Sequence, residues 1–311
     1  MVVAYNQENL IRETIGSILA QNYSNLEIVI SDDASTDNTP AIIKEYQKKY
    51  PEIIIPVLNS KNLGITGNSN TAFFACTGDL IAIMGGDDIY LPEKLHKQVK
   101  AFEDESVVLS YHPVDVFLHQ TGESLFITNQ TESERINDVY EIITKGGIPG
   151  ASSIMVRKSA CPEHGFDPEF PTVSDWIFSI EVAYMGKVVE IPSVLGRYRK
   201  HGEGASERTF ELLNESLLTL TKIRLKYPND EYLEGVCRSG RYRYLCGELF
   251  RQIENGNHTL ANDVKKMIEC YVPENKRRQW FVLSFFVSKN SIFKLSHYVL
   301  PKLKNIIKRI I

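Results

Sequence analysis

The first part of the chain, up to about residue 102, alternates between short apolar runs and stretches with helical periodicity. We expect strands over 2–4, 26–30, 53–58 and 80–84. The intervening helices are expected over 10–19, 40–50, 68–76 and 92–102. Strands that alternate with helices in this way form a mostly parallel sheet, because a parallel connection needs a crossover helix. The order therefore predicts an α/β fold with helices flanking the sheet.

Acidic pairs follow two of these expected strands at their carboxyl ends. Asp32 and Asp33 come after the second strand, and Asp87 and Asp88 come after the strand at 80–84. Ligands of parallel α/β sheets bind beyond the carboxyl ends of the strands, so we expect both pairs to face one ligand. Carboxylate oxygens also suit a hard divalent cation such as Mg²⁺ or Mn²⁺. The pattern predicts a metal-assisted ligand site.

Regular alternation stops after residue 102. A strand or bent strand is expected over 107–118, loop and helix over 119–145, and another strand over 150–156. A helix at 176–184 and a strand at 188–191 complete this part. From about 207 the pattern is helical, with helices expected near 212–225, 230–254 and 258–271. We place a boundary near 205, which divides the chain into a domain at 1–205 and a helical C-terminal region at 206–311.

The end of the chain mixes basic and apolar residues. No acidic residue follows Glu274, and lysines and arginines alternate there with aromatic and aliphatic side chains up to Ile311. Such a segment can lie on an anionic membrane surface. A helix that packs on the domain with a solvated basic face fits the same pattern. Both interpretations stay open at this point.

Bulk composition narrows the class of protein. The chain has 311 residues, 43% of them hydrophobic, and a net charge of −4, which argues against a general nucleic-acid binder. Its five cysteines include no C-x-x-C pair, which favours a reducing compartment. Met1 runs into Val2 without a basic or long apolar region, so no signal peptide is expected. We expect a cytoplasmic protein, peripheral at the inner face of the membrane if the tail binds lipid.

Several motifs then fall in a familiar order. They are Ala4-Tyr5-Asn6, the stretch 27–39, Asn62-Leu63-Gly64, the stretch 78–81, and the stretch 87–95. In order and spacing they resemble glycosyltransferase family 2, over roughly the first two-thirds of the chain. The resemblance implies a GT-A fold and an inverting enzyme that uses a nucleotide sugar and a divalent metal.

The resemblance also implies roles for single residues. Asp33, with Asp32 beside it, would accept hydrogen bonds from the uracil and the ribose of the donor. Taken alone, that loop also fits a helix cap. The residues that the resemblance assigns to the nucleotide are Ala4, Tyr5, Asn6, Asp32, Asp33, Asn62, Gly64, Asn70 and Asp87.

Asp87 matches the last acid of the family's Asp-x-Asp motif, whose first acid is replaced here by Gly85. Asp87 would hold Mn²⁺ or Mg²⁺ against the donor diphosphate, with Asp88 and His201 as further metal ligands. A turn before a helix is the alternative interpretation of the acidic pair. The resemblance also implies contacts with the substrate, from Gly150, Ser152, Trp176 and Arg199.

Asp175 matches the base of the family, in a Glu-Asp-Trp-like signature whose first acid is replaced by Ser174. As base it would take the proton of the acceptor hydroxyl, although it also fits a helix N-cap. The implied activity is transfer of a sugar, UDP-linked, to a hydroxyl of a saccharide or lipid-linked saccharide during assembly of a cell-surface polysaccharide. Two alternatives remain. The first is a nucleotidyltransferase, although the sequence has no glycine-rich phosphate loop near its N-terminus. The second is a non-catalytic nucleotide-sugar-binding or scaffold protein, in which Gly85 and Ser174 would mark the loss of catalytic residues.

Overall fold

The computed structural model describes residues 1–201, 209–278, 280–281 and 284. The chain divides into two compact units, one of residues 1–142 and 147–208 and one of residues 143–146 and 209–311. The boundary that we predicted near 205 falls in the segment 202–208, outside the described residues. The units are therefore treated one at a time.

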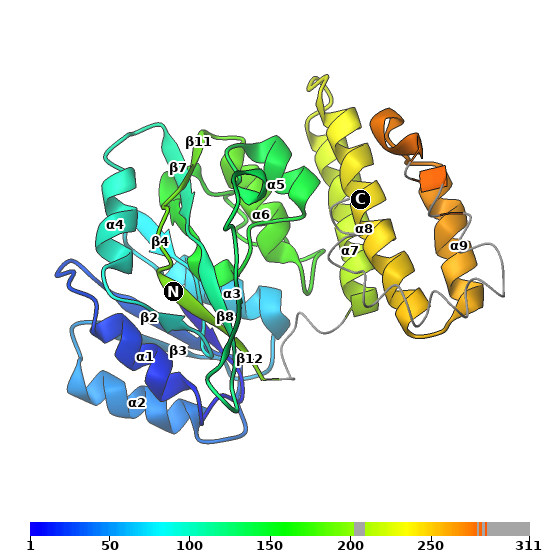
Figure 1. Ribbon diagram of the computed structural model, residues 1–311. Coiled ribbons are helices and arrows are strands. Elements are labelled where there is room, and N and C mark those ends of the chain that lie inside the picture. The colour runs from blue at the N-terminus through cyan, green and yellow to red at the C-terminus, as the bar shows by residue number, and fades with distance from the viewer. Residues whose placement is uncertain (202–208, 279, 282–283, 285–311) are drawn as a thin grey trace. The chain divides into compact units, whose positions relative to one another are not determined.

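A parallel sheet forms the centre of the first unit (Figure 1). Its strands are β1 (Val2–Ala4), β2 (Ile28–Asp32), β3 (Ile54–Leu58) and β5 (Met84–Gly85), in the order β3-β2-β1-β5. Every pairing in this sheet is parallel. The connecting helices are α1 (Ile11–Leu19), α2 (Thr39–Lys49) and α3 (Gly64–Ala75). The prediction of a parallel sheet flanked by helices is thus confirmed, with α3 beginning earlier than the expected residue 68.

The core of this sheet follows from the apolar faces of its helices. Ile11, Ile15 and Ile18 recur along α1 at helical spacing and are buried against the sheet together with Ile28 and Ile30 of β2. Every residue of β2 is buried, as expected for a strand covered on both faces. This core holds the parallel strands in place, and the polar loops begin where these strands end.

The expected strand at 80–84 is divided between two sheets. Only its end joins the parallel sheet as β5, whereas β4 (Leu80–Ala82) pairs antiparallel with β10 (Met155–Arg157). The second sheet has the order β11-β7-β10-β4, with β7 (Val107–Tyr111) and β11 (Lys187–Glu190). The segment 107–118 is likewise divided, into β7 and β8 (Val114–Leu118). Pro113 lies between them and lacks the N–H that a continuous strand would need.

A third sheet has the order β6-β12-β8-β9. It adds β6 (Ile89–Tyr90), β9 (Ser124–Ile127) and β12 (Gly196–Lys200), none of which was expected as a strand. The strand predicted over 150–156 begins only at β10, because Ala151–Ser153 form a short 3-10 helix, η2. The first unit also contains α4 (Lys94–Ala101), α5 (Val139–Lys145) and α6 (Ser174–Ala183), together with the short 3-10 helices η1 (Glu132–Glu134) and η3 (Lys158–Ala160). Helix α5 runs on into residues of the second unit.

The second unit contains α7 (Thr209–Lys226), α8 (Leu233–Glu254) and α9 (His258–Glu269), which confirms a helical C-terminal region. Leu245, Leu249 and Ile253 of α8 meet Ala261 and Ile268 of α9 in its core. Most of the basic and apolar tail lies outside the described residues. In the part of the chain that is described, no helix has both the length and the apolar character of a membrane span.

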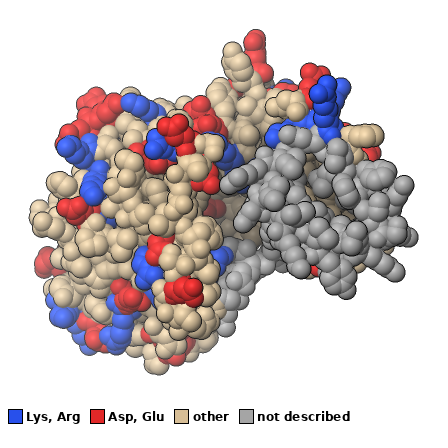
Figure 2. All heavy atoms as spheres, viewed as in Figure 1, with Lys and Arg blue, Asp and Glu red and all other residues tan. Residues whose placement is uncertain are grey.

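Most charged side chains of the first unit lie on its surface, but one lysine is buried. On the face drawn in Figure 2, acidic and basic side chains are interspersed over this unit. Lys94 of α4, in contrast, is fully buried. Its ammonium lies 4.3 Å from the centre of the Tyr90 ring and donates to the side-chain oxygen of Gln98. Burial lowers the pKa of Lys94 to about 7.

We expect Lys94→Met to raise the free energy of unfolding near pH 6 by about 2 kcal/mol, because it removes a buried charge. Unfolded Lys94 holds its proton up to about pH 10.4, whereas the folded chain releases it near pH 7. The unfolded state thus binds more protons in this window, and the wild-type chain gains stability as the pH rises. The advantage of the variant should therefore shrink from pH 7 towards pH 10 in urea unfolding.

Lys97→Met is the matched control, since Lys97 is 39% exposed on the same helix and pairs with Glu93. Its effect should be small at every pH. A Lys94→Met effect that did not change with pH would show that the ammonium is not held in a low-dielectric environment.

Candidate active site

The loops after β1 and β2 are tied together at the carboxyl edge of the parallel sheet. The Asn6 amide donates to the Ser35 hydroxyl (2.8 Å), and the Asn6 side-chain oxygen accepts from the Thr36 amide (2.9 Å). Asn6 has a positive φ of 51°, a conformation that asparagine tolerates better than most residues. Tyr5 beside it is 48% exposed. The structure therefore brings two predicted nucleotide contacts, Tyr5 and Asn6, to the edge where ligands of such sheets bind.

Asp33 connects this edge to the next loop. Its buried carboxylate accepts from the amides of Leu63 (2.7 Å) and Gly64 (3.0 Å), and Asn62 donates to its carbonyl (3.3 Å). Gly64 has a φ of +76°, which favours glycine at this close approach. Asp33, Asn62 and Gly64, three of the residues that we predicted to bind the nucleotide, therefore lie together. Asn59 Nδ2 also lies 3.4 Å from Asp33 Oδ1, so three of the about four acceptor sites of this carboxylate are used within the protein.

The other predicted acids and amides have different neighbours. Asp32 accepts from the amide (3.0 Å) and the hydroxyl (2.5 Å) of Ser35, which shapes the loop after β2. The carbonyl of Ala4, at the end of β1, accepts from the Asp33 amide (3.0 Å). The amide group of Asn70 is bonded at both ends to the backbone of Phe166, at 2.7 Å each. The structure thus places Asn70 away from the Asp33 group.

Asn68 joins the same edge although the sequence did not single it out. Its buried side chain donates to the carbonyls of Ala4 (3.3 Å) and Ser31 (3.2 Å) and accepts from Asn59 (3.0 Å). It therefore links β1, β2 and the loop after β3. A buried asparagine inside a helix is unfavourable unless it is bonded in this way, and that misfit is the only local signal for its role.

Asp87 lies at the tip of the turn that follows β5. Its Oδ2 is 3.0 Å from His201 Nε2, and the two side chains are 22% and 17% exposed. At Gly85, a β-carbon would lie 2.7 Å from Asp87 Oδ1. Glycine at 85 therefore leaves the room that the Asp87 carboxylate occupies. Two predicted metal ligands, Asp87 and His201, converge although they are distant in sequence.

Asp88 points into the protein instead. Its carboxylate accepts from the Arg199 amide (2.9 Å) and from the Ser152 hydroxyl, and its carbonyl accepts from the Thr14 hydroxyl (2.8 Å). Burial, together with the nearby charge of Asp87, raises the pKa of Asp88 to about 7. Two predicted residues, Ser152 and Asp88, therefore bind each other.

The Arg199 side chain, predicted as a substrate contact, is 4% exposed and engaged within the protein. It donates to the Asp87 carbonyl (2.6 Å) and to the Glu13 carboxylate (2.5 Å), and its guanidinium lies 4.8 Å from the centre of the Phe117 ring. Arg199 thus fixes the backbone of Asp87. Glu13 was missed by the sequence analysis, as was Thr14, although a polar threonine on the apolar face of α1 was a visible signal.

Asp175 lies in the first turn of α6 and is partly exposed. Its neighbour Ser174 is buried, with its hydroxyl 2.8 Å from that of Thr66 in α3. Trp176, a predicted substrate contact, is 6% exposed and donates to the Ile142 carbonyl (3.2 Å). Gly150, with φ of +73°, precedes η2 and so sets the turn that leads to Ser152. Helix α6 therefore presents Asp175, while its neighbours anchor the helix.

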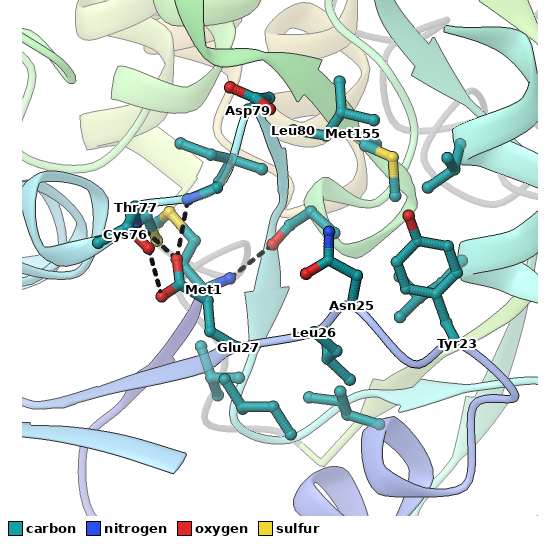
Figure 3. A pocket seen from close by; sticks show the side chains of 18 of the residues that line it. Met1, Tyr23, Asn25, Leu26, Glu27, Cys76, Thr77, Asp79, Leu80 and Met155 are labelled. Atoms are coloured by element: carbon teal, nitrogen blue, oxygen red, sulfur yellow. Dashed lines mark hydrogen bonds between the residues drawn. The ribbon is translucent and has the colours of Figure 1, made fainter. Parts of the chain in front are cut away.

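A separate cavity of about 470 Å³ lies at the opposite edge of the sheet, among residues that precede β2 and β4 (Figure 3). There the Met1 ammonium donates to the Ala82 carbonyl (2.8 Å), and Glu27 accepts from the amides of Thr77 (2.6 Å) and Gly78 (3.0 Å). Asp79 also lines this cavity. None of the site residues predicted from the sequence line it.

Comparison with protein families identifies the chain. Residues 1–161 match the model of glycosyl transferase family 2. The chain belongs to this family. EpsE of Bacillus subtilis, whose name describes it as a putative glycosyltransferase, is 41% identical to this chain over 240 residues. The match covers 74% of this chain and 83% of EpsE. An uncharacterized protein of Mycobacterium tuberculosis is 31% identical over 205 residues, which cover 65% of this chain but only 58% of that protein.

Solved structures confirm the GT-A-like fold that we predicted for this family member. S. aureus TarS in complex with UDP-GlcNAc superposes with a TM-score of 0.62 at 17% identity, covering 90% of this chain and 77% of TarS. The mannosyltransferase PcManGT of Pyrobaculum calidifontis, in complex with GDP-Man and Mn²⁺, has a TM-score of 0.56 at 18% identity. That match covers 96% of this chain and 85% of PcManGT. At this level of identity the likeness concerns the fold.

We expect Arg199→Lys to lower the free energy of unfolding by about 3 kcal/mol, because one ammonium cannot replace a buried guanidinium that reaches both Asp87 and Glu13. Arg197→Lys is the control on the same strand. Arg197 pairs with Asp115 (2.8 Å) but its side chain is 27% exposed, so its replacement should cost about 1 kcal/mol or less. Thermal and urea unfolding measure both. Equal losses in the two variants would contradict the role of Arg199.

Proposed function

We propose that the chain is an inverting glycosyltransferase that moves a sugar from a UDP-linked donor to a hydroxyl of a saccharide or lipid-linked saccharide. The observation that carries the proposal is the convergence of Asp87 and His201 at the edge where the Asp33 loop also lies. Family membership supports the same reaction class. The setting that we propose is assembly of a cell-surface polysaccharide at the cytoplasmic face of a membrane.

The nucleoside would bind at the Asp33 group. Asp33 is held by two backbone amides and by the Asn59 side chain, so the one acceptor site that remains for a ligand points in a fixed direction. Imide and hydroxyl donors of a uridine suit such an acceptor. Tyr5 is half-exposed beside this loop and offers a ring face to a base. Ordering of the loop before the ligand arrives reduces the entropy that binding would cost.

The metal would be held by Asp87 and His201. Their side chains converge and stay partly exposed, so a carboxylate oxygen and an imidazole nitrogen lie 3.0 Å apart at one point. In the described part of the chain no group of three or more His, Cys, Asp or Glu side chains gathers as a metal-binding cluster. A divalent ion that keeps waters and substrate phosphates among its ligands fits one or two protein ligands. Asp88 does not fit this role, because its oxygens already accept from Arg199 and Ser152.

When bound, Mn²⁺ or Mg²⁺ would neutralise the negative charge of the departing diphosphate. The residues of the chain then supply the rest. Arg199 holds the Asp87 backbone through its carbonyl, which keeps the carboxylate directed outward. Asp175 takes the proton from the acceptor hydroxyl as that oxygen attacks the anomeric carbon opposite the leaving group. Attack from that side inverts the anomeric configuration.

Relatives with more specific names support the donor and the acceptor. An Escherichia coli protein named UDP-Glc:alpha-D-GlcNAc-diphosphoundecaprenol beta-1,3-glucosyltransferase, WfaP, is 36% identical over 111 residues, which cover 36% of this chain and 43% of WfaP. Its name states a UDP-linked donor and a lipid-linked acceptor. Contact with a membrane surface through the basic and apolar tail would suit such an acceptor. That part of the proposal rests on the sequence pattern alone.

Asp87→Asn tests the metal site. With UDP present, Mn²⁺ should raise the melting temperature of the wild-type chain, because a ligand of the folded state stabilises it. The variant should need at least about tenfold more Mn²⁺ for the same shift, since an amide is a poorer ligand than a carboxylate. Asp79→Asn is the control, as Asp79 lines the cavity at the opposite edge. Identical Mn²⁺ curves for Asp87→Asn and wild type would remove Asp87 from the site.

Asp175→Asn tests the base. Transfer or slow hydrolysis of a UDP-sugar with Mn²⁺ should lose about 10²–10⁴ in kcat, the contribution typical of a positioned general base. The KM for the donor should hardly change, because Asp175 does not contact the nucleotide in this proposal. Full activity in the variant would mean that another group takes the proton. Nucleotide binding without turnover in the wild-type chain would instead favour a non-catalytic nucleotide-sugar-binding protein.

A further inference from the structure

Helix α4 carries two buried polar residues that have no part in the chemistry above. Lys94 and Gln98 are each 0% exposed and lie one turn apart on the inner face of the helix. The Lys94 ammonium donates to Gln98 Oε1 and faces the Tyr90 ring. Burying an ammonium without a carboxylate partner costs stability.

The other end of the Gln98 amide reaches the segment before β10. Its Nε2 donates to the carbonyl of Ser153 (2.9 Å) and lies near the carbonyl (3.3 Å) and hydroxyl (3.2 Å) of Ser110 in β7. Ser153 is the last residue of η2. The 3-10 helix is therefore fastened to α4 and β7 through one amide.

The same short helix touches the proposed metal site. The hydroxyl of Ser152 donates to Asp88 and accepts from the Gly85 amide (3.2 Å). Gly85 and Asp88 flank Asp87 in the turn that presents its carboxylate. A continuous series of contacts thus runs from Lys94 through Gln98 and η2 to both sides of Asp87.

The direction of the Gln98 amide decides whether this series holds. A glutamine amide can turn over, which exchanges its donor and acceptor ends. The protonated Lys94 ammonium has donors only and the Ser153 carbonyl accepts only, so a flipped amide would place its N–H groups against the ammonium and its oxygen against the carbonyl. The ammonium and the carbonyls of Ser110 and Ser153 together therefore hold Oε1 towards Lys94 and Nε2 towards Ser153. In a low-dielectric interior this preference is stronger than it would be in water.

We propose that Lys94 and Gln98 are positioning residues that fix η2. Through Ser152, η2 in turn fixes the turn of residues 85–88, which would hold Asp87 at the metal and the diphosphate. The inference rests on the proposed function for its effect on turnover. Its effect on the local structure of residues 150–156 does not depend on that function.

Two variants and one control test it. Lys94→Met removes the ammonium, and Gln98→Glu keeps an acceptor for Lys94 while removing the donor to Ser153. Lys97→Met changes a partly exposed lysine of the same helix. Hydrogen exchange resolved by peptide should show about tenfold faster exchange over 84–90 and 150–156 in the first two variants. Lys97→Met should match the wild type, and exchange in β2 should be unchanged in all variants.

Turnover gives the second measurement. With UDP-sugar and Mn²⁺, kcat should fall about tenfold in Lys94→Met and Gln98→Glu, because a small displacement of Asp87 weakens stabilisation of the leaving group. Lys94→Met should lose activity while its unfolding temperature at pH 7 stays equal or rises, which a residue needed only for stability would not show. If both variants kept wild-type exchange over 150–156, the inference would be overturned. If the wild-type chain turned over no nucleotide sugar, the proposed function would fail while the exchange result still decided the positioning role.

Discussion

The buried carboxylate of Asp88 joins segments of the first unit that lie far apart in the sequence. The carboxylate accepts from the Arg199 amide in β12 and from the Ser152 hydroxyl in η2. The backbone carbonyl of Asp88 accepts from the Thr14 hydroxyl in α1. An unpaired carboxylate in this place would cost several kcal/mol. Burial alone pushes the pKa of the group upward, and the donors from Ser152 and Arg199 oppose that shift. The position of Asp87 therefore depends on a neighbour that faces away from solvent.

Two departures from the family's sequence pattern can be understood in the same physical terms. At Gly85 a side chain would begin 2.7 Å from the Asp87 carboxylate, so glycine leaves that oxygen in place. At Ser174 a hydroxyl meets the hydroxyl of Thr66 in a buried contact that a charged carboxylate would make costly. Each small residue therefore fits the packing around an acid that is retained next to it or nearby, Asp87 in the first case and Asp175 in the second.

The parallel sheet was predictable because its signals are local. Apolar strands and amphipathic helices repeat within about 30 residues, and their polar carboxyl ends mark the edge at which Asp33 and Asp87 emerge. The strand at β12 was missed because Gly196–Lys200 is rich in basic residues, and its pairing with β6 and β8 joins residues far apart in the chain. The division of 80–84 was missed because β4 pairs with β10, a strand that lies beyond residue 150. The bond of Asn70 to Phe166 was likewise not predictable, because it joins residues 96 positions apart in the sequence.

A polar layer beneath the site does what apolar packing would not. Hydrophobic contacts are non-directional, so an apolar core under η2 would fill space without choosing one orientation for Ser152. Hydrogen bonds to a 3-10 turn are directional, and Gln98 supplies one at the Ser153 carbonyl. The carbonyls of Ser110 and Ser153 and the Lys94 ammonium all favour one orientation of this amide, and the buried ammonium does so at a cost in stability. Replacement of a buried charge by an apolar side chain often stabilises a protein. In our proposal Lys94 acts in this layer on the orientation of the Gln98 amide, which fastens η2 next to the turn around Asp87.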